Sequence, residues 1–393
     1  MDKSVSSNYR PIALPTAASK LLELILKEKL SDWLYTSDAQ FGFKSKHGTD
    51  MAIYSLKETI KCYTSSNSPV FVCFMDASKA FDRLNHRKLF EVLRGRGAPE
   101  YIIRFLSYWY FAQKYYVKWG HSVSSSFSVS NGIRQGGLLS PLLYNVYTDD
   151  LSRRLKTAKI GCHIAGECLN HISYADDMAL LAPSIKALQA MVELCIIFAE
   201  EHDIIYNAKK TVCMTFWPRG YRKFQVQPIT MRSTTLSYVQ EATYLGHILS
   251  ADLKDNLDMS RQMKALYAMG NTLVRKFGKC SDTVKCELFR AYCEQLYCST
   301  LWCCYTLETL RRLRVSHNDV LRRLLGFPRW TSASSLFVAA GLNNLDVLMR
   351  KAVFSFRTRL ATSENRLISG LYNSSAFIKS KLYSVWKCSL ELS

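Results

Sequence analysis

The stretch HISYADDMALLA, residues 171–182, decides the fold, because two adjacent aspartates stand between two apolar runs. Short apolar runs on either side of a polar turn predict the two strands of a hairpin. Asp176 and Asp177 carry like charges that repel, and partial burial makes the repulsion worse. A hard cation such as Mg²⁺ relieves it, because Mg²⁺ prefers oxygen ligands. An isolated Asp-Asp pair is more often a solvated surface pair, which is our interpretation of Asp149 and Asp150 in TDDLSRRL.

A third carboxylate, Asp76, ends the apolar run VFVCFM at residues 70–75, which follows a polar loop. Such a run predicts a buried strand, and a charge at its end does not serve packing. If this strand neighbours the 171–182 hairpin, three carboxylates converge at one sheet edge, as two-metal phosphoryl transfer requires. The alternative is that Asp76 is the N-cap of a helix predicted from Ala80 to Arg96.

The rest of the chain predicts an α+β body followed by a helical part, with a boundary near residue 252. Strands are expected in a hairpin over 114–130, at 211–216 and in a pair within 224–250, and helices over 16–34 (capped by Thr16 or Ser19), 49–63, 100–111, 140–155 and 184–203.

The charge of the chain predicts a polyanionic partner. The 393 residues are 48% hydrophobic, enough for a sizeable core, yet they carry a net charge of +20 and a pI of about 9.4. Because the basic residues are spread over the whole chain, nucleic acid is a better match than a membrane surface. No apolar run approaches the roughly 20 residues of a membrane span. The polar start MDKSVSSNYR predicts no secretion signal, so we expect the nucleus or cytoplasm.

The cysteines predict neither disulfides nor zinc. There are 13, at irregular spacing and without a CxxC pair, and free thiols fit a reducing compartment. Cys293, Cys298, Cys303 and Cys304 lie in the run 291–313, which reads as one continuous helix. We therefore interpret them as buried helical thiols rather than as a metal site.

Seven blocks, in order, carry a family resemblance. The sequence resembles the reverse transcriptases of non-LTR (LINE-type) retrotransposons, and more distantly those of group II introns, over about residues 8–250. One YxDD motif is weak support, whereas seven ordered blocks make a chance match improbable. The blocks are NYRPIAL (8–14), QFGFKSKHGTD (40–50), VFVCFMDASKAFDRLNH (70–86), GIRQGGLLSPLLYNVY (132–147), YADDMALLA (174–182), NAKKT (207–211) and YLGHILS (244–250).

The resemblance implies an RNA-directed DNA polymerase with a right-hand fold: fingers, a palm sheet with helices on one face, and a helical thumb. It assigns residues 1–69 to N-terminally truncated fingers, 70–252 to the palm with a fingers insertion at about 97–130, 253–330 to the thumb and 331–393 to a helical extension. Neither an endonuclease domain nor a zinc knuckle is expected, so the chain resembles the polymerase part of an element.

The resemblance also implies roles for single residues. Asp76, Asp176 and Asp177 would hold two Mg²⁺ ions, with Mn²⁺ as a substitute, and Lys210 would protonate pyrophosphate as a general acid. The residues implied in nucleotide binding are Arg10 on the triphosphate, Phe81 under the sugar as a selector of deoxynucleotides, and Gln135, Gly136 and Tyr174 nearby. Gly137 departs from the Ser or Thr that is usual in the family.

Most of these residues also have a plainer interpretation. Arg10 is alternatively a surface arginine, Phe81 a core residue of an amphipathic helix, and Lys210 a basic loop residue. Tyr244 to Gly246, implied as part of the primer grip, are equally consistent with an ordinary turn.

The implied partners are an RNA template, a DNA primer and deoxynucleotides. Two other functions compete. One is a catalytically silent relic that binds RNA or DNA, as a maturase does, and the other is a basic scaffold bound to chromatin by charge. A polymerase making RNA shares the palm, but Phe81 and the set of blocks favour DNA synthesis.

Overall fold

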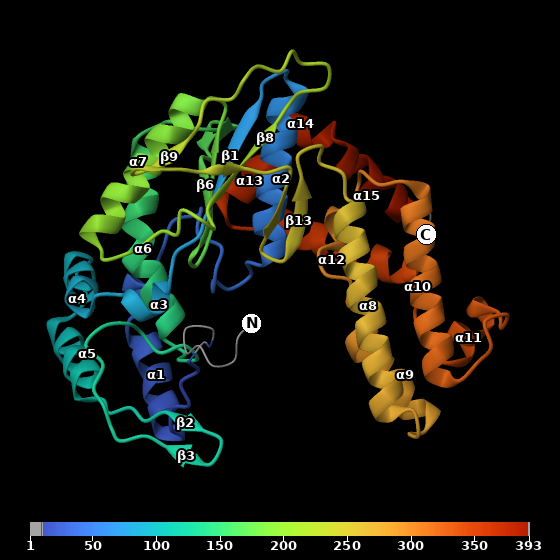
Figure 1. The fold of residues 1–393 in the computed structure, drawn as a ribbon, viewed down its shortest axis with the longest axis horizontal. Coiled ribbons are helices and arrows are strands. Elements are labelled where there is room, and N and C mark those ends of the chain that lie inside the picture. Colours follow the sequence, from blue (N-terminus) through green and yellow to red (C-terminus); the bar gives the residue numbers. More distant parts are fainter. Residues whose placement is uncertain (1–8, 10, 392–393) are drawn as a thin grey trace.

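The computed structural model describes Tyr9 and residues 11–391, arranged as an arch in Figure 1. Its centre is a five-stranded sheet with the order β11-β8-β1-β7-β6. The predicted hairpin is confirmed, because β6 and β7 pair antiparallel and Tyr174 faces Asp177 across the turn. The strands of the sheet are β1 (Val70–Met75), β6 (His171–Tyr174), β7 (Asp177–Ala182), β8 (Val212–Phe216) and β11 (Ser237–Tyr238).

Strand β1 is the middle strand, and all six of its residues are buried. It pairs antiparallel with β7, with Phe71 opposite Ala182 and Met75 opposite Met178. The prediction that this strand neighbours the 171–182 hairpin is therefore confirmed.

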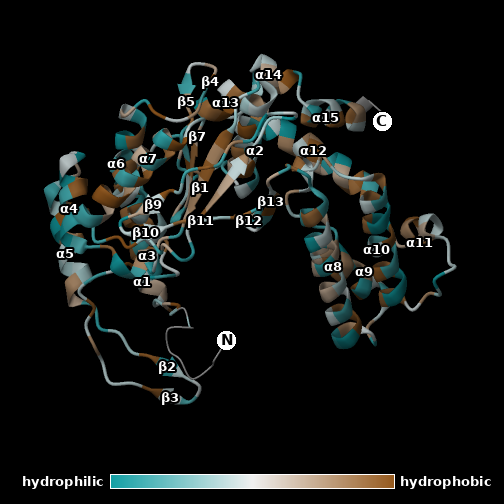
Figure 2. Cartoon of the chain, turned by 45° about the horizontal axis from the view of Figure 1, so that its top comes forward, coloured by the Kyte–Doolittle hydropathy of each residue, from teal (hydrophilic) through white to brown (hydrophobic). Residues whose placement is uncertain are grey.

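Helices cover both faces of the sheet. Phe71, Cys73 and Met75 face a core that includes residues of α6 (Ser140–Thr157) and α7 (Ile185–Glu201). Side chains alternate along a strand, so the other three residues of β1 face the opposite core. That core includes residues of α2 (Thr49–Ser65). The predicted α+β class is confirmed. Helices are expected on one face of the sheet, whereas they cover both. The reason is that all the residues of β1 are apolar and need burial on both sides (Figure 2).

The C-terminal helices complete the second face, folding back onto α2 after the chain has left the body (Figure 1). Trp386 is fully buried there and stacks on Tyr54 of α2, with the ring centroids 6.2 Å apart. These helices are α12 (Leu345–Ala361), α13 (Arg366–Tyr372), α14 (Ser375–Ile378) and α15 (Lys381–Glu391).

Further helices pack against the core of the first face, and one exposed hairpin lies beyond them (Figure 1). As predicted, Thr16 caps the first helix, accepting a hydrogen bond from the Ser19 amide. The helix expected over 80–96 is two helices, because Asn85 interrupts it and caps the second. The elements are α1 (Ala17–Lys29), η2 (Ser31–Trp33), α3 (Ala80–Arg83), α4 (His86–Gly95), α5 (Glu100–Ala112), β2 (Lys118–Trp119) and β3 (Ser122–Val123).

The other limb of the arch is helical and has hydrophobic clusters of its own (Figure 1). The single helix expected over 291–313 is wrong. The chain leaves the helix after Cys293, and Cys298 takes a left-handed conformation with φ +56°. The elements are α8 (Asn256–Phe277), α9 (Asp282–Cys293), η3 (Ser299–Leu301), α10 (Leu307–Leu325) and α11 (Ala333–Ala339).

Short hairpins connect the larger elements. They are formed by β4 (His163–Ile164) with β5 (Glu167–Cys168), β9 (Thr230–Met231) with β10 (Thr234–Thr235), and β12 (Glu241–Tyr244) with β13 (His247–Ser250). Within the described residues, none of the helices is long and apolar enough to cross a membrane.

The interpretation of Asp149 and Asp150 as a surface pair is wrong for Asp149. Its side chain is buried, accepts a hydrogen bond from the Ser37 amide at 2.7 Å and pairs with Arg96 at 2.7 Å. A buried carboxylate of this kind is balanced by a guanidinium and an amide rather than by a metal ion.

Candidate functional site

Asp76 lies at the end of β1, held there by its own backbone. The Asn207 amide donates to the Asp76 carbonyl at 2.8 Å, and the Asp76 amide donates to Thr211 Oγ1 at 3.2 Å. These bonds fix the loop NAKKT beside the strand end. The N-cap alternative for Asp76 is wrong, because the N-cap of α3 is Lys79 and no side chain caps that helix.

The two other predicted aspartates lie beside Asp76. Met75 pairs with Met178 in the antiparallel register. Asp76 follows Met75 and Asp177 precedes Met178, so both aspartates lie at the same edge of the sheet. Asp76 and Asp176 are half-buried and Asp177 is exposed. The structure thus brings all three predicted carboxylates to one end of β1 and β7.

A cavity of about 380 Å³ opens at this edge. Asp76, Asp177 and Lys210 line it together, and the turn of the β12–β13 hairpin, Tyr244 to Gly246, forms another wall. Asp176 instead lines a small pocket of about 20 Å³ on the other side of the turn, with Gln40 and Asn145. The cavity therefore combines two of the predicted metal ligands with the predicted general acid and the predicted primer-grip residues.

The donor set fits a hard cation. The groups are carboxylate oxygens, which Mg²⁺ prefers, and Asp76 and Asp177 line a cavity with room for its water ligands. Among the described residues, the one group of three or more potential ligands with all donor atoms within 4.8 Å is Asp255, Cys303 and Cys304. The carboxylate oxygens of the three aspartates share an edge of the sheet but do not all lie within 4.8 Å of one another.

Two buried tyrosines report the negative charge of this edge. Burial, and then the nearby Asp176 carboxylate, raise the pKa of Tyr144 far above its usual range. Burial and the Asp177 carboxylate do the same to the pKa of Tyr244. Both phenols therefore stay neutral, and the negative charge at this edge does not come from these tyrosines.

The tight turn between β6 and β7 is supported by residues to which the sequence had assigned no role. Ala175 takes a left-handed conformation with φ +57°, which is unfavourable for a side chain with a Cβ. Gln40 Oε1 accepts hydrogen bonds from the Ala175 amide at 2.9 Å and the Gly42 amide at 2.8 Å. Asn145 Nδ2 donates to the Gly42 carbonyl at 2.6 Å. Gln40 and Asn145 are both buried. Their hydrogen bonds therefore support the turn that carries the aspartates from its buried side.

The sequence signal for this support was present but ambiguous. Gln40 and Gly42 belong to the block QFGF, yet a glutamine and a glycine in a loop have many uses. Only the fold shows that Gln40 forms a β-bridge with Ser173 of β6.

We expect Gly42→Ala to displace the turn. A Cβ at residue 42 would lie 2.5 Å from the Ala175 nitrogen, and backbone cannot give way as a flexible side chain can. Overpacking of this kind costs about 1–3 kcal/mol, which chemical denaturation would measure. Gly95→Ala at the end of α4 is the matched control, because nothing lies within 4 Å of its added Cβ. Equal stability of the two variants would contradict the close approach.

The residues predicted to bind nucleotide form a second group. The Phe81 ring stacks on Tyr144, with centroids 4.7 Å apart and planes at 14°. The Ile133 amide donates to the Phe81 carbonyl at 2.8 Å, and Gln135 Nε2 donates to Asp82 Oδ1 at 3.0 Å. Phe81 is half-buried and packs against the core of the first face.

The 134–137 loop connects this group to the N-terminal block. The Ala13 amide donates to the Gln135 carbonyl at 2.9 Å, and Gly136 has φ +102°, a conformation that favours glycine. At Gly137, a Cβ would lie 2.6 Å from Ser140 Oγ, so the Ser140 side chain would have to shift. Arg10 lies outside the described residues.

The other two predicted residues lie near the same edge. Lys210 is exposed on the loop after Asn207, and Tyr174 is half-buried with its ring centroid 6.3 Å from that of Phe43. The turn at Leu245 and Gly246 has positive φ at both residues, 48° and 76°, which is the conformation of a two-residue hairpin turn.

Comparison with known proteins supports the predicted resemblance. The sequence model of the family described as reverse transcriptase (RNA-dependent DNA polymerase) matches residues 1–249. The polymerase of the mobile element jockey from Drosophila funebris is 25% identical over 375 residues, which is 92% of this chain and 40% of the relative. The Pol polyprotein of the retrotransposable element R2DM from Drosophila melanogaster is 28% identical over 261 residues, 61% of this chain and 23% of the relative.

Among solved structures, the apo telomerase of Candida tropicalis is similar at 14% identity and a TM-score of 0.45, covering 95% of this chain and 58% of the other. The chain spans 40% or less of the length of the two curated relatives. The family match covers more than half of the chain and includes the edge that carries Asp76, Asp176 and Asp177. The chain therefore belongs to the reverse transcriptase (RNA-dependent DNA polymerase) family, and its curated relatives are the polymerases of non-LTR retrotransposons.

Proposed function

We propose that the chain synthesises DNA on an RNA template, using two divalent cations held by Asp76, Asp176 and Asp177. The observation that carries this proposal is the shared edge of β1 and β7, where Asp76, Asp177 and Lys210 line one cavity. Family membership supports the reaction class. In the same proposal, the sheet with α6 and α7 is the palm, and the elements before β1 and α5 with β2–β3 form the fingers. Helices α8–α10 form the thumb, and the helices from α11 onward form the C-terminal extension.

The three carboxylates supply the ligands. Asp76, Asp176 and Asp177 would hold the ions, which would supply activation of a primer 3′-hydroxyl and charge stabilisation for the leaving pyrophosphate. Asp76 and Asp177 line the cavity. The side-chain oxygen of Gln40 accepts a hydrogen bond from the Ala175 amide and so fixes the backbone between Tyr174 and Asp176. A rigid turn keeps both aspartates in place as charge develops, which is the basis of electrostatic preorganisation.

Lys210 is the proposed proton donor to pyrophosphate. Lys210 lines the same cavity as Asp76 and Asp177, which places a basic side chain beside the proposed metal ligands. We expect Lys210→Gln to slow single-nucleotide incorporation by about 10²-fold or more, the usual contribution of a general acid. Lys209→Gln is the matched control, because Lys209 is exposed on the same loop and does not line the cavity. Equal rates for the two variants would remove Lys210 from the mechanism.

Phe81 is the proposed selector of deoxynucleotides. Its ring is held against Tyr144, so it cannot move aside for an added hydroxyl without breaking the stack. We expect Phe81→Ala to raise incorporation of ribonucleotides relative to deoxynucleotides by about tenfold or more, the scale of one lost steric contact. Phe105→Ala on the exposed face of α5 controls for loss of an aromatic ring. Unchanged selectivity in Phe81→Ala would contradict this role.

The charge of the chain supports a nucleic-acid substrate. Part of the charge on α10 is already paired, since Arg314 contacts Asp346 and Arg322 contacts Asp319. We therefore propose that binding of the template–primer duplex draws on the net +20 of the whole chain rather than on these arginines alone. Phosphate binding of this kind weakens steeply as salt rises.

Primer extension on poly(rA)·oligo(dT) with Mg²⁺ tests the proposal. We expect incorporation of dTMP that stops when the Mg²⁺ is chelated. Fluorescence anisotropy on the same labelled duplex shows whether the protein is folded and bound. Binding without any synthesis would contradict the proposed reaction and support the alternative of a silent nucleic-acid-binding relic.

A further inference from the structure

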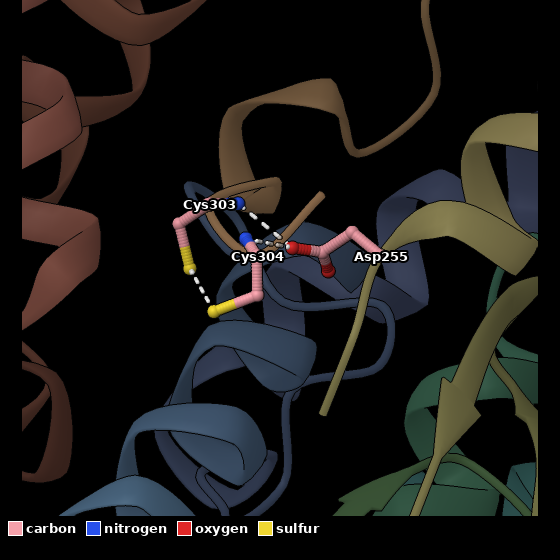
Figure 3. Close-up of side chains that lie close together, drawn as sticks. All are labelled: Asp255, Cys303 and Cys304. Carbon is pink, nitrogen blue, oxygen red and sulfur yellow. Dashed lines mark hydrogen bonds between the residues drawn. The ribbon is translucent and has the colours of Figure 1, made fainter. Parts of the chain in front are cut away.

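Two adjacent cysteines lie together where the helical limb meets the body. Cys303 and Cys304 follow η3 and precede α10, and their sulfur atoms are 3.7 Å apart. Asp255, the N-cap of α8, lies beside them (Figure 3). Cys303 is buried and Cys304 is half-buried, so the pair borders the surface. Neighbouring residues of a helix point in different directions, which is why the helical interpretation of this run hid the pair.

Asp255 fixes the peptide that carries both thiols. Its Oδ2 accepts hydrogen bonds from the Cys303 and Cys304 amides, both at 2.7 Å. Its own amide donates to the Cys304 carbonyl, also at 2.7 Å. Figure 3 shows the two side chains turned toward each other on the side away from this carboxylate. The hydrogen bonds to Asp255 therefore hold the backbone in a conformation in which the two sulfur atoms lie close together.

The charges around the pair are balanced. Lys57 Nζ contacts Asp255 Oδ1 at 2.5 Å, and Lys61 Nζ contacts Glu58 Oε1 at 2.7 Å. Lys61 Nζ also lies 3.3 Å from Cys303 Sγ. Exchange of two thiol protons for one divalent cation leaves the net charge of this buried cluster unchanged. Lys61 would donate to the bound sulfur as an outer partner of the kind that orients metal ligands.

We propose that Cys303 and Cys304 form a bidentate thiolate site for a soft divalent cation of the Zn²⁺ class. A tetrahedral ion with metal–sulfur bonds of about 2.3 Å holds two sulfurs about 3.8 Å apart, close to the spacing already present. Both Asp255 oxygens are engaged, so Asp255 is the anchor of the peptide and water completes the coordination. This site is separate from the proposed Mg²⁺ edge, which offers only oxygen ligands.

Cadmium is the probe, because its bonds to thiolate sulfur give an ultraviolet charge-transfer band. We expect titration of the reduced chain with Cd²⁺ to show one equivalent that the double variant Cys303→Ser/Cys304→Ser lacks. Cys280→Ser/Cys286→Ser is the matched control, since those two thiols are also half-buried, and it should retain the equivalent. Identical titrations of the wild type and the Cys303/Cys304 double variant would overturn the proposal.

A second measurement needs no variant. Alkylation of the wild-type chain, followed by mass spectrometry, reports each thiol separately. At a free Zn²⁺ concentration ten times the Kd, we expect Cys304 to react about tenfold more slowly, because occupancy sets the protection. Cys388 is exposed and should react at the same rate with and without Zn²⁺. Equal alkylation of Cys304 in both conditions would overturn the site even if the serine variants fail to fold.

Discussion

Asp76→Asn is expected to lower single-turnover primer extension about a thousandfold or more while leaving duplex binding intact. The substitution removes a carboxylate charge at the end of β1 and keeps the shape and the backbone hydrogen bonds to Asn207 and Thr211. A divalent cation stabilises the transition state by several kcal/mol, and about 4 kcal/mol corresponds to roughly a thousandfold in rate. Rapid-quench incorporation of one dTMP on an RNA template measures the effect.

The matched control for Asp76→Asn is Asp32→Asn, which removes one exposed carboxylate in η2, outside the cavity. Both variants change the net charge equally, so any shared loss reports a general electrostatic effect on nucleic-acid binding. Loss in Asp76→Asn alone supports a metal ligand. A wild-type rate in Asp76→Asn would remove this residue from the site.

Asp255→Ala is expected to cost about 3–5 kcal/mol of unfolding free energy, the usual effect of breaking a buried ion pair. The side chains of Lys57 and Asp255 are 3% and 2% exposed, so the substitution leaves a buried ammonium group without its partner. It also removes the acceptor of the Cys303 and Cys304 amides. Denaturant unfolding followed by circular dichroism measures the loss.

Glu200→Ala is the comparison for Asp255→Ala, because Glu200 pairs with Arg232 at the surface, with side chains 57% and 62% exposed. Exposed pairs contribute about 0–1 kcal/mol. If Asp255→Ala were no more damaging than Glu200→Ala, the joint between α2, α8 and the 301–304 segment would not depend on this ion pair.

The centre of the fold could be predicted because local pattern and tertiary structure agree there. VFVCFM is short, apolar at every position and preceded by a turn signal, which favours a strand buried on both faces, and HISYADDMALLA contains its own turn. The blocks 70–86, 174–182 and 207–211 then met at one edge, as the resemblance implied. Asp76, Asp177 and Lys210, which the sequence singles out, line one cavity.

The errors arise where a contact distant in sequence overrides the local pattern. The run 291–313 has a helical composition, but the helix ends at Cys293, and Asp255 holds the Cys303 and Cys304 amides in a non-helical segment. The sequence around Asp149 is typical of a surface residue, but the fold pairs it with Arg96, 53 positions away. Gln40 supports the Ala175 turn from 135 positions away, and no periodicity shows such a pairing.

The most direct test of the central claim is a single-turnover incorporation of dTTP in which sulfur replaces one non-bridging oxygen of the α-phosphate. Both diastereomers would be measured on poly(rA)·oligo(dT), with Mg²⁺ and then with Mn²⁺. If ions held by Asp76, Asp176 and Asp177 contact that phosphate, one diastereomer is slow with Mg²⁺ and recovers with Mn²⁺, which accepts sulfur more readily. Rates that depend on neither the sulfur position nor the metal would contradict the account.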